Sequence, residues 1–66
     1  MWTVVYIAPN KSMAEMYKNI LSGEGLLVQL RAIGTPQQGD SGSVEILVPE
    51  SEAEEAHEII INARGT

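Results

Sequence analysis

The stretch VEILVPESEAEEAHEIII, residues 44–61, decides the fold. Its first five residues alternate between the two faces of a strand, with Val44, Ile46 and Val48 on one face and Glu45 and Leu47 on the other. A proline ends this strand, and the residues after it have the spacing of an amphipathic helix. We therefore expect a strand whose branched face is covered by the helix that follows it.

The predicted C-terminal helix begins after Pro49, where Ser51 and Glu54 have the spacing of a capping box. Glutamates crowd its first turns, where negative charge complements the helix dipole. This acidic run is more often a solvated helix start than a cation site. The apolar stripe of the helix consists of Ala53, Ala56, Ile59, Ile60 and Ala63.

A first strand is predicted over residues 2–8, WTVVYIA, because β-branched and aromatic residues fill a run that is too short for a helix. Pro9 ends it. Both faces are apolar under strict alternation, with Thr3, Val5 and Ile7 on one face and Trp2, Val4 and Tyr6 on the other. One face can pack against the core, and the other then needs a further structural element or a partner to shield it from water.

A first helix follows, from about residue 11 or 13 to residue 22. Asn10 and Ser12 are both candidate N-caps, and Ser12 with Glu15 has the spacing of a capping box. We expect Gly23 to end the helix. The predicted core stripe consists of Met13, Met16, Tyr17, Ile20 and Leu21.

The run LLVQLRAI, residues 26–33, alternates as a second strand. If Leu30 pairs with Ile46, core residues oppose each other and Arg31 faces Glu45, a cross-strand pair of opposite charge. Residues 4–21 and 44–61 share a strand, proline and helix pattern at an offset of 40. The resulting βαββα order predicts an α+β, ferredoxin-like single domain over residues 1–66. It has a three-stranded antiparallel sheet in the order 1-3-2 with two helices on one face.

This order lacks the fourth strand of a ferredoxin-like fold, which would lie beside the first strand. The first strand thus keeps an unpaired edge and an apolar second face. We expect a homodimer that covers a surface formed by Trp2, Val4 and Tyr6.

The composition of the chain argues against several classes of protein. A chain of 66 residues without cysteine has neither a disulfide nor a large core, and its one histidine makes a structural zinc site unexpected. The net charge of −5 disfavours nucleic acid as a partner. Neither a signal peptide nor a membrane span is recognisable, so we expect a cytoplasmic protein that does not bind membranes.

Chemistry-bearing residues are few. The loop GTPQQGDSGS, residues 34–43, can form an anion nest or a partner contact, although a plain connection is the more frequent use of such a composition. His57 lies beside the apolar stripe without a second histidine or cysteine, which favours a boundary residue over a catalytic or metal role. Lys11 and Lys18 alone could form a Schiff base. The candidate ligand or partner residues are Gly34, Gly39, Asp40, Ser41, Gly42 and Ser43.

Several segments resemble the DUF2007 family of prokaryotic signal-transducing proteins, which share a fold with the PII (GlnB-like) regulators. They are VVYIAPN with Ala14-Glu15, Glu24-Gly25 before a strand, and the closing VPESEAEEA. The resemblance implies a self-associating module with a regulatory role, whose partner loop corresponds to residues 34–43. That loop is short here and lacks the tyrosine that some PII proteins modify.

These observations predict a small non-enzymatic regulatory module, without a cofactor, that binds a small ligand or a protein partner as a dimer. The alternative is a structural interaction domain with no ligand. An enzyme ranks last, because no nucleophile and base can be paired in this sequence.

Overall fold

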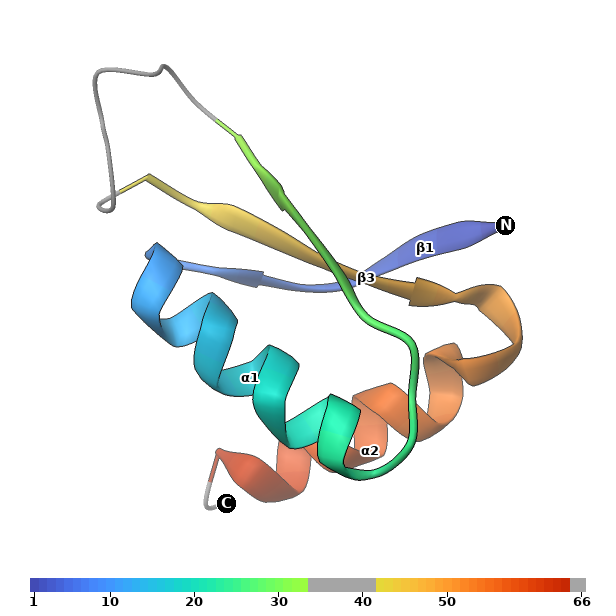
Figure 1. Cartoon of the computed structure of the whole chain (residues 1–66). Helices are drawn as coiled ribbons and strands as arrows, with labels where there is room; N and C mark the ends of the chain where they lie inside the picture. The colour runs from blue at the N-terminus through green and yellow to red at the C-terminus, as the bar shows by residue number, and fades with distance from the viewer. Residues whose placement is uncertain (34–41, 65–66) are drawn as a thin grey trace.

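The computed structural model describes residues 1–33 and 42–64 as two layers, a sheet and a pair of helices on one of its faces (Figure 1). The elements follow the order β1 (Trp2–Ala8), α1 (Lys11–Gly23), β2 (Gln29–Ala32), β3 (Val44–Pro49), the 3-10 turn η2 (Glu50–Glu52) and α2 (Ala53–Ala63). This arrangement confirms the predicted α+β, ferredoxin-like fold.

The sheet is antiparallel and has the order β1-β3-β2, as the sequence predicts. Leu30 pairs with Ile46 and Arg31 pairs with Glu45, so the predicted register is confirmed. One more backbone hydrogen bond follows the last paired residues, from the Ile33 N–H to the Ser43 carbonyl at 3.0 Å. Strand β2 itself is shorter than the run of alternating residues that predicted it.

Strand β1 contains a β-bulge, which the sequence analysis did not predict. Val4 pairs with Leu47 and Tyr6 pairs with Ile46, so Val5 is an extra residue on β1. A bulge turns every later side chain to the opposite face. The prediction that Ile7 shares a face with Val5, and Tyr6 with Val4, is therefore wrong.

The core lies between the sheet and the two helices. The predicted branched face of β3 is buried. The largest fully buried side chains are Leu21, Ile46 and Val48. Ala14 and Ala56 are also fully buried, which lets the helix backbones approach the sheet. The buried line of α1 runs through Ala14, Tyr17 and Leu21. The prediction that Met16 fills the core is wrong, because its position on the helix lies outside that line and it is 42% exposed.

The N-terminus of α1 is capped by Asn10. Its extended backbone places the side-chain Oδ1 2.8 Å from the Met13 N–H, from which it accepts a hydrogen bond. Ser12 lies inside the helix, so Asn10 is the right choice of the two predicted caps. Helix α2 differs, because η2 precedes it and no side chain caps it. The predicted capping box of Ser51 and Glu54 is absent because Ser51 belongs to the 3-10 turn.

The left-handed glycine that follows the C-terminus of α1 is Gly25 rather than the predicted Gly23. Gly25 has a φ of +90°, and its N–H donates to the Ser22 carbonyl at 2.9 Å. The Leu26 N–H donates to the Leu21 carbonyl at 3.2 Å, which completes a Schellman motif. Gly23 keeps the negative φ of a helical residue and occupies the last helical turn.

Substituting Gly25 with alanine is expected to lower the free energy of unfolding by about 1–2 kcal/mol, because a Cβ disfavours the left-handed conformation. Gly23→Ala is the matched control. It sits in the helix with open space around it, so alanine should be neutral or stabilise by up to about 1 kcal/mol. Urea denaturation of both variants measures the difference, and equal effects would contradict the assignment of Gly25 as the helix-ending residue.

Candidate functional site

The sheet face opposite the helices is the candidate site, and we call it the open face. Cross-strand partners share a face, so the pairing assigns its members. Val4, Leu47 and Gln29 form one row across the three strands, and Ile7, Glu45 and Arg31 form the next. The open face consists of Trp2, Val4, Ile7, Gln29, Arg31, Ile33, Glu45, Leu47 and Pro49.

Large apolar side chains of the open face are accessible to solvent. Trp2 is 45% exposed and Ile7 is 51% exposed, and neither is covered by a helix. Leu47 differs, since it is only 6% exposed although it lies outside the helix-covered core cluster. Its place in the middle strand, between Val4 and Gln29, accounts for this burial. An apolar centre with exposed apolar neighbours is typical of an interaction surface.

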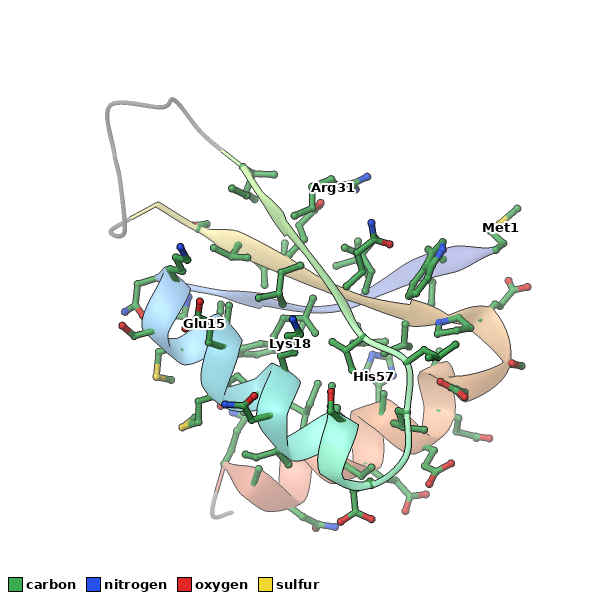
Figure 2. The ribbon with its side chains drawn as sticks, viewed as in Figure 1. Met1, Glu15, Lys18, Arg31 and His57 are labelled. Carbon is green, nitrogen blue, oxygen red and sulfur yellow. The ribbon has the colours of Figure 1, made fainter. Side chains whose placement is uncertain are left out.

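The charges of the open face cancel. Arg31 donates from Nε to Glu45 Oε1 at 2.6 Å, and these are the two charged residues of the three strands. Figure 2 shows Arg31 on the side of the sheet away from the helices, whereas His57 comes from α2. The Arg31 side chain is 61% exposed, so the pair contributes no more than about 1 kcal/mol to folding. Its main consequence is a face without net charge.

Tyr6 does not belong to the open face, which corrects the predicted dimer surface of Trp2, Val4 and Tyr6. Its ring meets that of Tyr17 edge to face, with 5.0 Å between the centroids, on the helix side of the sheet. The Arg64 guanidinium carbon lies 5.7 Å from the Tyr6 ring centroid. The bulge at Val5 causes this exchange, and Ile7 takes the place on the open face that alternation gave to Tyr6.

Burial raises the pKa of Tyr17 above the usual 10.0, and the neighbouring Tyr6 phenol adds to the effect while Arg64 opposes it. Below pH 10 both the folded and unfolded states keep the proton. As the pH rises through 10 the unfolded state ionises first, so the free energy of unfolding should fall until the pH passes the folded pKa. Urea denaturation at several alkaline pH values should show a smaller fall for Tyr17→Phe; an equal fall would contradict this origin.

The predicted ligand loop is described only in part. Gly34, Gly39, Asp40 and Ser41 lie outside the described residues. Gly42 and Ser43 are described and half-buried, and the Ser43 carbonyl takes part in the sheet. The structure therefore describes only two of these six residues, and the predicted ligand loop stays a prediction.

The other candidate residues lie on the two helices, His57 exposed on α2 and Lys11 and Lys18 exposed on α1. Within residues 1–33 and 42–64, no group of three or more histidine, cysteine, aspartate or glutamate side chains could hold a metal ion. None of the helices in this part of the chain has the length and apolar composition to cross a bilayer.

Comparisons of the chain with protein-family models, curated proteins and solved structures gave no match. The resemblance to the DUF2007 family stays a prediction from the residues that carry it.

Proposed function

We propose that this chain is a small, non-enzymatic regulatory module of the cytoplasm that works by binding at its open face. The observation that carries the proposal is a sheet with one face packed on helices and one face left apolar and accessible. Antiparallel sheets that face water on one side usually carry polar residues there. On the open face these positions are occupied by Trp2, Val4 and Ile7, which favours the binding of a partner over exposure to water.

The dimensions of the fold support a binding role over a catalytic one. The principal-axis extents of the chain are 33 × 29 × 17 Å, so the molecule is thin along its shortest axis. Catalysis usually needs a concave site that excludes water. A flat face suits a macromolecular partner, and the DUF2007 resemblance, with its signal-transducing role, agrees with such a partner. A small ligand held at residues 34–43 remains part of this proposal.

The test is thermal unfolding in the presence of nucleotides, amino acids and 2-oxo acids, with wild type, Ile7→Lys and Met16→Lys compared. A ligand at 100 times its Kd adds about 2.7 kcal/mol, which raises the Tm of a domain this small by several degrees. Met16 is an exposed apolar residue on α1 and serves as the control. A ligand of the open face should shift wild type and Met16→Lys but not Ile7→Lys. An undiminished shift in Ile7→Lys would place the ligand site elsewhere.

A further inference from the structure

We infer that the occupant of the open face is a second copy of this chain, stacked sheet on sheet. The inference rests on the proposed function and names its partner. Three properties of the described residues support it, namely the charge of the open face, the shape of the β1 edge and the area available.

Charge favours a second copy at this face. Arg31 and Glu45 cancel within the open face, so the whole net charge of −5 belongs to the rest of the chain. Glu54, Glu55 and Glu58 lie on α2 in the helix layer, and Glu50 and Glu52 lie on η2, which follows the end of β3. Two copies that meet through their helices would bring these like charges together. Two copies that meet through the open face keep them apart.

The ion pair also suits a twofold arrangement. In a twofold interface each residue meets the same patch of the partner, so a self-complementary surface is required. The open face has a positive and a negative group side by side in one row, flanked by apolar side chains. A twofold axis close to this row can place the Arg31 of each copy near the partner's ion pair with opposite charges adjacent.

Sheet stacking is favoured over pairing of β1 edges. The outer edge of β1 has no partner strand among the described residues, yet the bulge at Val5 interrupts its regular hydrogen-bonding geometry. Bulges are one of the devices by which edge strands avoid pairing with other chains. Stacking, in contrast, needs only apolar side chains that point away from the helices, which Trp2, Val4 and Ile7 supply.

The available area fits a reversible dimer. A standard interface buries roughly 800 Å² on each partner. Three strands of four to seven residues, about 4.8 Å apart and rising about 3.4 Å per residue, present a smaller face of a few hundred Å². We therefore expect a weak dimer, which dissociates in the range from about ten to a few hundred micromolar.

The test is sedimentation and light scattering over that concentration range for wild type, Ile7→Lys, Ile33→Lys and Met16→Lys. Each lysine adds the same charge. On the open face it would be desolvated in the dimer, so Ile7→Lys and Ile33→Lys should each raise the Kd by about tenfold or more. Ile7 pairs with Glu45, so Ile7→Lys gains an opposite charge in the monomer and should stay folded. Met16→Lys should leave the Kd unchanged within about twofold, because Met16 lies on α1.

Trp2 fluorescence separates stacking from edge pairing. Stacked sheets bury the indole, so its emission should shift to shorter wavelength with the same concentration dependence as the mass. A dimer with unshifted emission, or one insensitive to both open-face lysines, would overturn the stacking inference. If the measured mass equalled that of one chain at every concentration, a second copy would not be the partner. The proposed function would still stand in that case if a ligand raised the Tm of wild type and Met16→Lys but not that of Ile7→Lys.

Discussion

Replacing Ile46 with alanine is expected to remove most of the stability of this protein. Ile46 is fully buried in the middle strand, on the face that both helices cover. Its truncation loses the transfer free energy of the side chain and leaves a cavity, together about 2–5 kcal/mol. A single core in a chain of this size rarely supplies more than about 3–5 kcal/mol in total. A large unfolded fraction should therefore be present at 25 °C.

Circular dichroism with urea denaturation measures this effect, with Ile46→Val as a graded control. That change removes one methylene and should cost about 0.5–1.5 kcal/mol. All variants must be compared at one dilute protein concentration, because association stabilises the folded state by mass action. If Ile46→Ala unfolded with nearly the wild-type midpoint, Ile46 would not lie at the centre of the core.

The register of the sheet could be predicted because its signals are local and agree with one another. The alternation of Val44, Ile46 and Val48 determines which face of β3 is buried. Opposing Leu30 to Ile46 then satisfies both the apolar face and the charge pair of Arg31 and Glu45. A shift by one residue would put apolar side chains against water, so few registers compete.

The bulge in β1 could not be predicted, because nothing in WTVVYIA marks it. Bulges are often signalled by glycine, but here Val5 is the extra residue and is itself buried. Both faces of the strand are apolar, so the alternation does not indicate which residues turn towards the core. Two thirds of the predicted dimer surface, Trp2 and Val4, lie on the open face, and Tyr6 was assigned to it only because the extra residue was missed.

The exact ends of α1 could not be predicted from the sequence either. SGEG, residues 22–25, contains two glycines, and either can end a helix from sequence alone. The choice of Gly25 depends on Leu26, which must follow the left-handed residue directly in order to reach the core. The tertiary contact therefore decides between two locally equivalent positions. At the N-terminus of α1, Asn10 and Ser12 are likewise both possible caps from sequence alone, and in the structure Asn10 makes the capping hydrogen bond.

Truncating Leu21 is the second change with a large expected effect, because this residue joins the core to the end of α1. Its side chain is fully buried, and its carbonyl accepts the Leu26 N–H that closes the Schellman motif. An apolar contact between these two positions commonly accompanies that motif, and Leu26 is itself buried in the same cluster. Leu21→Ala should therefore lower the free energy of unfolding by about 2–5 kcal/mol.

Leu27→Ala is the matched control, since the same atoms are removed from a side chain that is 63% exposed. Its backbone N–H, which donates to Glu52 Oε1 at 3.1 Å, is retained in the variant. The expected change is within about 0.5 kcal/mol, as for most exposed sites. Hydrogen exchange adds a local readout, because Leu21→Ala should accelerate exchange of the Leu26 amide more than that of the Met13 amide at the N-cap. Similar losses of stability in Leu21→Ala and Leu27→Ala would mean that the turn after α1 is not anchored through the core.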